Sequence, residues 1–220
     1  MKKKHILLPV LLLVIIISSC NYKKPEVLIV GDSISLGYTP FTKKHFAEKA
    51  IISHNKGNAQ HSGYGLENIE KWVGDKDWDI IQFNWGLWDL CYRHPDSKVQ
   101  GNRDKEHGDV TFSPEEYAAN LEAIVSILKK KTDAKLIFVT TTYVPKNEAG
   151  RYEADAIKYN DVAKKIMKKH DIAVNDIYEK SIAIHNKYGQ GSHAVHYKSE
   201  GYRKLSELII AYLEKELKML

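Results

Sequence analysis

Short apolar runs recur along this chain and are separated by stretches with helical spacing. The runs lie at residues 27–30, 51–52, 80–83, 136–139 and 172–174, and none shows the alternation of polar and apolar residues that is typical of a half-exposed strand. Strands that are apolar on both sides belong to parallel sheets whose two faces are covered. The pattern therefore predicts a mostly parallel sheet of about five strands.

The segments between these runs have the periodicity of helices. The clearest begins with a capping-box sequence at residues 113–116, in which Pro114 occupies the first helical position. Apolar residues recur at helical spacing in three segments: Tyr117, Leu121, Ile124 and Leu128; Ile157, Val162, Ile166 and Met167; and Leu205, Leu208, Ile209, Tyr212 and Leu213. Strands that alternate with helices form βαβ units with right-handed crossovers. We therefore expect a single α/β domain over residues 27–220, built as a three-layer α/β/α sandwich.

The amino terminus has the features of a secretory signal. Three lysines at residues 2–4 precede an apolar run at residues 6–17, which is shorter than the roughly 20 residues that a membrane-spanning helix needs. Residues 17–20, Ile-Ser-Ser-Cys, resemble a bacterial lipobox, and the resemblance implies cleavage before Cys20 and acylation of its thiol. We expect a signal peptide at residues 1–19, a lipidated tether at residues 20–26, and a cell-envelope protein, periplasmic or surface-exposed, that is lipid-anchored to a membrane. The alternative is an ordinary signal peptide with an incidental cysteine.

Cleavage at this point changes the charge and the cysteine content of the mature chain. It removes three of the 33 basic residues and none of the 28 acidic ones, so the mature chain is nearly neutral and nothing indicates a nucleic-acid partner. If the lipid occupies Cys20, Cys91 is the single remaining cysteine and an intramolecular disulfide is excluded.

A serine follows the first predicted strand directly, in the sequence Gly31-Asp32-Ser33, and a helical segment comes after it. The free N–H groups of a first helical turn can stabilise an oxyanion on an attacked carbonyl. Ser33 is therefore a candidate nucleophile. The alternative is that Asp32 and Ser33 only cap the helix, as such residues often do.

A histidine in the corresponding place, before the last predicted helix, is a candidate base. His196 precedes that helix, and the outer βα connections of a doubly wound sheet can bring such a residue to Ser33. His193 and His196 are also spaced as metal ligands on a helix would be, but no plausible third ligand accompanies them, so we expect no metal and no cofactor. Cys91 is a weaker candidate nucleophile, because no histidine pattern accompanies it.

The long polar segment at residues 91–112 shows no convincing periodicity. A connection of this length is usually functional or disordered. It leaves the carboxyl end of the predicted strand at residues 80–83, which is the edge where open α/β sheets bind ligands.

In these motifs the chain resembles the GDSL/SGNH hydrolases, a family of esterases, lipases and carbohydrate O-acetylesterases. Residues 31–35 resemble the first sequence block of the family, and the resemblance implies that Ser33 is the nucleophile and that its N–H donates to the oxyanion. Residues 195–202 resemble the last block, which implies that His196 is the general base. The resemblance spans about residues 27–213.

The chain departs from the family pattern at three places. His193 stands three residues before His196, where the family usually has an aspartate that orients the imidazole. Trp88 stands where the third block has an asparagine that donates to the oxyanion, so the donor is either its indole N–H or the side chain of Asn84. The second-block glycine corresponds to Gln60, whose backbone N–H is the favoured donor, with the Asn58 side chain as the alternative.

These features together predict a serine esterase that hydrolyses an acyl ester, with acetyl favoured, on a small molecule or glycan. Four aromatic residues lie near the predicted site and are normally core residues: Phe83, Trp85, Trp88 and Tyr92. Of these, Trp88 lies near the edge of the sheet, where it can stack on a sugar ring. We expect His196 and Ser33 to act as a dyad, with a backbone carbonyl orienting the imidazole. The alternative is a non-catalytic, glycan-binding envelope lipoprotein with a degenerate site, which the missing aspartate and asparagine favour.

Overall fold

The computed structural model of the chain describes residues 23–220, so the predicted signal peptide and Cys20 lie outside the described residues. Within this part of the chain, no helix combines the length and the apolar character that crossing a membrane requires.

The centre of the molecule is a five-stranded parallel sheet with the strand order β2-β1-β3-β6-β7. The strands are β1 (Glu26–Val30), β2 (Ile51–His54), β3 (Ile80–Phe83), β6 (Lys135–Val139) and β7 (Ala173–Asn175). Every residue of β1 and β3 is buried, as expected for central strands that are covered on both faces. The predicted parallel sheet and its five strand positions are confirmed.

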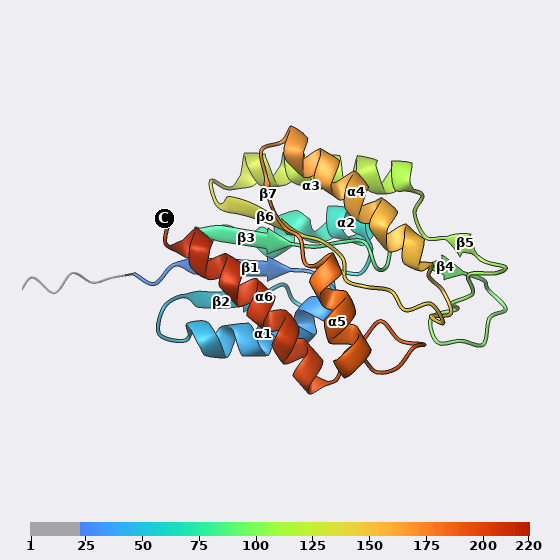
Figure 1. The fold of residues 1–220 in the computed structure, drawn as a ribbon. Helices are drawn as coiled ribbons and strands as arrows, with labels where there is room; N and C mark the ends of the chain where they lie inside the picture. The colour runs from blue at the N-terminus through green and yellow to red at the C-terminus, as the bar shows by residue number, and fades with distance from the viewer. Residues whose placement is uncertain (1–22) are drawn as a thin grey trace, which may run out of the picture.

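Helices cover both faces of the sheet, which confirms the three-layer sandwich (Figure 1). One layer contains α1 (Ser33–Phe46), α5 (Tyr178–Tyr188) and α6 (Ser199–Leu217), and the other contains α2 (Ser62–Val73), α3 (Pro114–Lys131) and α4 (Glu153–Lys169). The predicted capping box begins α3, because Ser113 accepts from the Glu116 N–H and the Glu116 carboxylate accepts from the Ser113 N–H. The helices α2 and α5 were not predicted from the sequence.

The polar segment at residues 91–112 is folded against the loop between β6 and α4. It contains the short antiparallel pair β4 (Tyr92–Arg93) and β5 (Asp109–Val110). The Tyr92 N–H donates to the Gly150 carbonyl at 2.7 Å, and the Lys105 N–H donates to the Ala149 carbonyl at 2.8 Å. This segment lies beyond the carboxyl ends of the strands (Figure 1), where the candidate site is found.

Candidate active site

Ser33 lies at the first position of α1, immediately beyond the carboxyl end of β1. Asp32 is the N-cap, and its side chain accepts a hydrogen bond from the Ile34 N–H at 2.9 Å. The Ser33 N–H has no hydrogen-bond partner among residues 23–220. A helix amino terminus with a free N–H suits an oxyanion. Asp32 therefore caps the helix, while Ser33 keeps both its hydroxyl and its N–H for a ligand.

The structure brings Ser33 and His196 together although they are far apart in the sequence. The Ser33 Oγ lies 2.9 Å from the His196 Nε2. Both side chains line one cavity, together with the segment that follows β3 and the segment at residues 91–112. At this distance a neutral imidazole can accept the hydroxyl proton as the serine attacks a carbonyl.

The segment around His196 is attached to the end of α5. The Gln190 N–H donates to the His196 carbonyl at 2.9 Å, and the Gln190 side chain donates to the Tyr197 carbonyl at 3.0 Å. Val195 and Tyr197, on either side of the histidine, are buried. The backbone therefore holds His196 from both sides.

The electrostatic environment favours the neutral form of His196. Its pKa lies below the ordinary histidine value, mainly because burial opposes the charged imidazolium. The guanidinium groups of Arg151 and Arg103 lower the pKa further, and the Glu148 carboxylate offsets part of this effect. A neutral imidazole is the form that acts as a general base.

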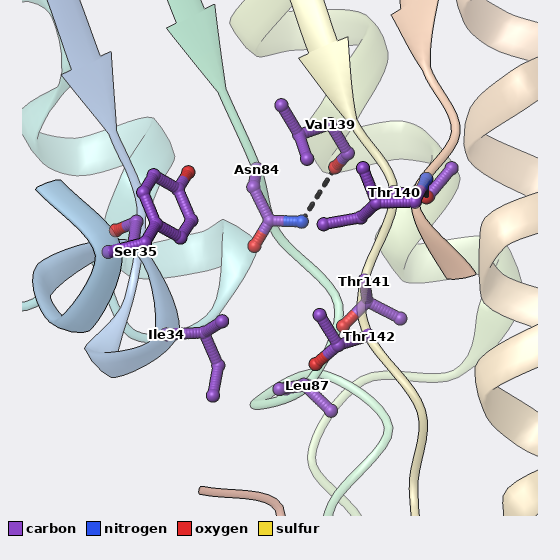
Figure 2. A pocket seen from close by; sticks show the side chains of 10 residues that line it. Ile34, Ser35, Asn84, Leu87, Val139, Thr140, Thr141 and Thr142 are labelled. Carbon is purple, nitrogen blue, oxygen red and sulfur yellow. Dashed lines mark hydrogen bonds between the residues drawn. The ribbon is translucent and has the colours of Figure 1, made fainter. Parts of the chain in front are cut away.

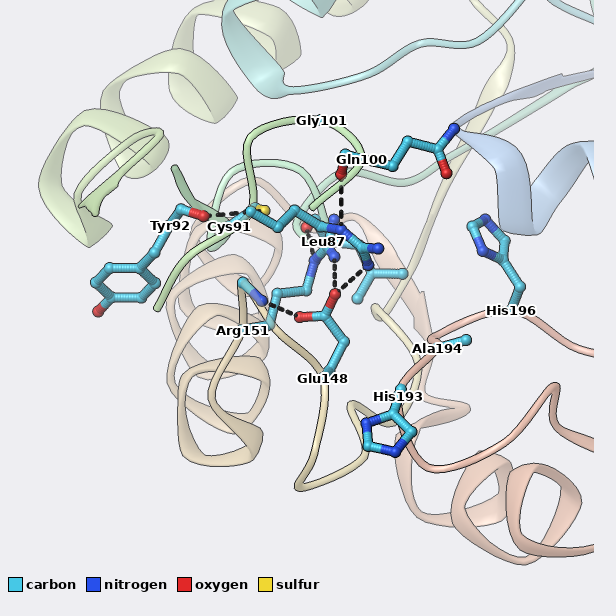
Figure 3. Close-up of polar contacts among 12 residues, drawn as sticks. Leu87, Cys91, Tyr92, Gln100, Gly101, Glu148, Arg151, His193, Ala194 and His196 are labelled. Carbon is cyan, nitrogen blue, oxygen red and sulfur yellow. Dashed lines mark hydrogen bonds and ion pairs between the residues drawn. The ribbon is translucent and has the colours of Figure 1, made fainter. Parts of the chain in front are cut away.

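His193 does not take the place of the family aspartate. Its side chain is exposed, and its Nδ1 lies 3.1 Å from the Asn147 carbonyl oxygen. Figure 3 shows the His193 and His196 rings on different sides of Ala194. Among the described residues, the His196 Nδ1 has no hydrogen-bond partner. The expected orienting carbonyl is therefore absent from the described part of the chain, where the one hydrogen bond of the imidazole is to Ser33.

Of the four predicted oxyanion donors, only Trp88 lines the cavity with Ser33 and His196. Its ring is half-buried, and the Arg93 guanidinium lies 5.2 Å from the ring centroid. The site therefore offers two candidate donors, the Ser33 N–H and the Trp88 indole N–H.

The other three predicted donors do not line this cavity. The Asn84 Nδ2 donates to the Val139 carbonyl at 2.7 Å, and the side chain lines a separate small cavity beside Ile34 and Ser35 (Figure 2). The Gln60 N–H donates to the Asn58 Oδ1 at 2.8 Å. Gln60 has a φ of 50°, a left-handed conformation that glycine adopts more readily. The structure therefore corrects the prediction that Asn84, Gln60 or Asn58 completes the oxyanion site.

The other candidate residues have structural roles. Phe83 and Trp85 are core residues, and the Trp85 indole donates to the Ala59 carbonyl at 3.2 Å. Cys91 is buried, which raises the pKa of its thiol and opposes the thiolate that a nucleophile requires. Within residues 23–220, His, Cys, Asp and Glu side chains nowhere gather in a group of three or more that is suited to a metal ion.

Three arginines that the sequence analysis did not single out also line the cavity, whose volume is about 340 Å³. They are Arg93, Arg103 and Arg151. The sequence alone gives no sign of this cluster, because two of these residues come from the segment at residues 91–112 and the third precedes α4. Only the packing of that segment against the β6–α4 loop brings them together.

Comparisons with known proteins identify the family and agree with this fold. The model of the GDSL-like lipase/acylhydrolase family matches residues 29–204. The solved structure of an acetyl xylan esterase, AlAXEase, is 15% identical over 85% of this chain and 98% of its own, with a TM-score of 0.67. A lipase/acylhydrolase from Enterococcus faecalis is 19% identical over 87% of this chain and 96% of its own, with a TM-score of 0.65.

A third solved structure is Axe2, an acetylxylan esterase from Geobacillus stearothermophilus. It is 18% identical over 85% of this chain and 93% of its own, with a TM-score of 0.64. The search of curated proteins found no match. At these identities the solved structures establish a shared fold, whereas the family model covers most of the chain. The chain therefore belongs to the GDSL-like lipase/acylhydrolase family and is a hydrolase of ester bonds.

Proposed function

We propose that this protein is a serine esterase that removes an acyl group, with acetyl favoured, from a carbohydrate by acyl transfer to Ser33. The observation that carries the proposal is the 2.9 Å contact between the Ser33 Oγ and the His196 Nε2 in an open cavity. A serine that only capped the helix would not need a histidine at hydrogen-bond distance.

In the proposed mechanism, His196 takes the Ser33 proton as the Oγ attacks the ester carbonyl. The imidazolium then protonates the leaving alcohol, and an acyl-enzyme remains on Ser33. His196 then deprotonates a water molecule, which attacks the acyl-enzyme; the carboxylic acid leaves and the imidazolium returns its proton to the Ser33 Oγ. No cofactor takes part in this proposal.

The oxyanion is held in this proposal by the Ser33 N–H at the start of α1, with the Trp88 indole N–H as the second donor. The free N–H groups and the positive end of the α1 dipole favour negative charge at this place. An indole is larger than the family asparagine, so Trp88 has to donate from a different position along the cavity wall.

The carbohydrate substrate rests on two supports. The aromatic face of Trp88 lines the cavity and can pack on a sugar ring. Two of the solved structures with this fold are named as acetyl xylan esterases.

We also propose that the protein acts in the bacterial cell envelope, anchored to a membrane by lipid on Cys20. The support is the lysine-rich start, the short apolar run and the lipobox-like residues 17–20. Residues 1–19 are then the signal peptide and residues 20–26 the tether that precedes the hydrolase domain.

The esterase proposal is tested with full-length protein, its Ser33→Ala variant and a Ser192→Ala control, since Ser192 is exposed and does not line the cavity. A fluorophosphonate should label the wild type and the control, and both should release acetate from a panel of acetylated sugars. Ser33→Ala should lose the label and most of the turnover. If Ser33→Ala keeps wild-type turnover, the assigned nucleophile is wrong. If the wild type binds glycans but hydrolyses no ester in the panel, the glycan-binding alternative is favoured.

A further inference from the structure

The cavity that contains Ser33 and His196 is rich in guanidinium groups. Arg93, Arg103 and Arg151 line the same cavity as Ser33 and His196. A substrate that reaches Ser33 is therefore enclosed together with three fixed positive charges.

Each guanidinium is positioned by bonds that leave part of it free. The Arg93 Nε donates to the Thr111 Oγ1 at 3.3 Å, and its Nη1 donates to the Gly101 carbonyl. The Arg103 Nε donates to the Gln100 carbonyl at 3.0 Å. In all three arginines, the Nη2 group has no hydrogen-bond partner among the described residues.

Arg151 provides the strongest evidence that these arginines bind a ligand. Its side chain is only 6% exposed, its Nε donates to the Leu87 carbonyl at 2.5 Å and its Nη1 donates to the Glu148 carboxylate at 3.0 Å. The Nη2 group is not one of the buried polar atoms without a partner, so this largely buried guanidinium, fixed through its other two nitrogens, keeps a donor that is open to the cavity and free for a ligand.

The nearby carboxylates do not balance these charges. Glu148 is fully buried and is shared by Arg103 and Arg151; Figure 3 shows its contact with Arg151. Asp32 is the other acid at the cavity; its Oδ1 accepts from the Ile34 N–H, and burial opposes its charged form. Two carboxylates therefore face three guanidiniums, which leaves an excess of one positive charge even when both acids are ionised.

We infer that the substrate is an ester of an acidic carbohydrate, with one negatively charged group held by Arg93, Arg103 and Arg151 while its acyl ester lies at Ser33. This inference rests on the proposed esterase function and adds the substrate class to it. A carboxylate fits best, because the planar guanidinium binds it in a bidentate manner and its single charge matches the excess. A sulfate monoester has the same charge, and the experiment distinguishes the two.

The volume of the cavity supports this arrangement. At about 340 Å³ it lies at the small end of ligand pockets, which span roughly 300–1,000 Å³. A group the size of one or two sugar rings that places an ester at Ser33 has to lie close to the arginines.

The experiment compares kcat/KM of the full-length protein on three O-acetylated methyl glycosides: the glucuronoside, the glucoside and the glucoside 6-sulfate. The wild type should prefer the glucuronoside over the glucoside by about tenfold or more, the usual effect of a charge-assisted hydrogen bond. Arg93→Gln and Arg103→Gln should each reduce this ratio several-fold, mainly by raising KM for the glucuronoside. Lys98→Gln removes an exposed charge from the same segment outside the cavity and should leave the ratio unchanged.

Binding of the same three glycosides to Ser33→Ala, measured by calorimetry, separates the inference from the proposed function. The anion site is supported if the glucuronoside binds more tightly than the glucoside and if Arg93→Gln abolishes this difference. This result stands even if the wild type hydrolyses no ester, and in that case only the esterase proposal fails. Equal turnover and equal binding of the glucuronoside and the glucoside would overturn the inference and leave the esterase intact. If the 6-sulfate binds most tightly, the anion that the three arginines prefer is a sulfate monoester and not a carboxylate.

Discussion

Among single residues, His196 differs from the histidine of a Ser-His-Asp triad in the partners of its two ring nitrogens. The Nε2 lies 2.9 Å from the Ser33 Oγ, whereas the Nδ1 has no partner among the described residues. In a triad, the acid fixes the tautomer and stabilises the imidazolium that forms during attack. Here Arg151 and Arg103 act in the opposite direction, since they disfavour the imidazolium, and Glu148 compensates only in part.

This arrangement predicts that activity depends on one histidine and not on two. His196→Ala should lower kcat/KM by about 10³-fold, by analogy with the loss of a triad member elsewhere, and His193→Ala should change it less than about twofold. The profile of kcat/KM against pH should rise through a single ionisation. Its midpoint should lie below the ordinary histidine value of about 6.5, because burial and the two arginines lower the pKa of His196 and the base is active when neutral.

His193→Asp is the matched variant for this series. It restores the residue type of the family, but the side chain at this position is exposed and faces the Asn147 carbonyl, so no gain in rate is expected. A His193→Ala loss as large as that of His196→Ala, with an unchanged circular dichroism spectrum, would instead make His193 a catalytic residue.

At the scale of elements, the sequence predicted the sheet better than it predicted the site. All five strands lie at their expected positions because continuous burial leaves a clear apolar signal. The helix α2 was missed although Ile69 and Val73 are buried at helical spacing. Its N-cap is His61, whose Nδ1 accepts from the Tyr64 N–H at 3.0 Å, and histidine is not one of the residue types by which a helix start is normally recognised.

The residues of the proposed site show the same contrast. Ser33 and His196 were predicted because each lies beside an element boundary that the sequence marks. Of the four predicted oxyanion donors only Trp88 lines the cavity, because alignment to the family blocks gives residue positions but not the directions of side chains. Backbone and side-chain bonds turn the amide groups of Gln60 and Asn84 toward Asn58 and Val139.

The packing of α1 on α6 predicts a specific sensitivity at Gly37. A Cβ at this position would lie 2.1 Å from the Tyr202 Cε1, so Gly37→Ala has to move the ring or separate the helices. The variant gains up to about 1 kcal/mol of helix propensity, but overpacking costs about 1–3 kcal/mol. We expect a net loss of stability in urea denaturation, and a loss of activity because α1 begins at Ser33 and α6 follows His196. Lys44→Ala, at an exposed position of α1, is the control; equal midpoints for the two variants would contradict the prediction.

For the whole molecule, the direction of β1 separates the proposed anchor from the site. The strand begins at Glu26, next to the proposed tether, and Ser33 lies just beyond its other end. Five residues at about 3.3 Å each place these ends about 16 Å apart. In Figure 1 the amino-terminal end of β1 and the β4–β5 segment lie on opposite sides of the molecule. A chain that is tethered before residue 26 therefore points its cavity away from the attachment point.

This geometry predicts that the anchor determines where the protein is found but not how fast it reacts. Cys20→Ala should abolish metabolic labelling by a radioactive fatty acid and move the protein out of the detergent-extractable membrane fraction, because no helix among residues 23–220 can span a bilayer and hold it there. Cys91→Ala is the matched control and should keep the label, since the Cys91 thiol is buried in the folded domain. The kcat/KM of purified Cys20→Ala on an acetyl ester should equal that of the wild type, because the tether joins the amino-terminal end of β1 and Ser33 lies beyond the other end of this strand. Equal labelling of Cys20→Ala and the wild type would show that the cysteine is incidental and that the signal is an ordinary one.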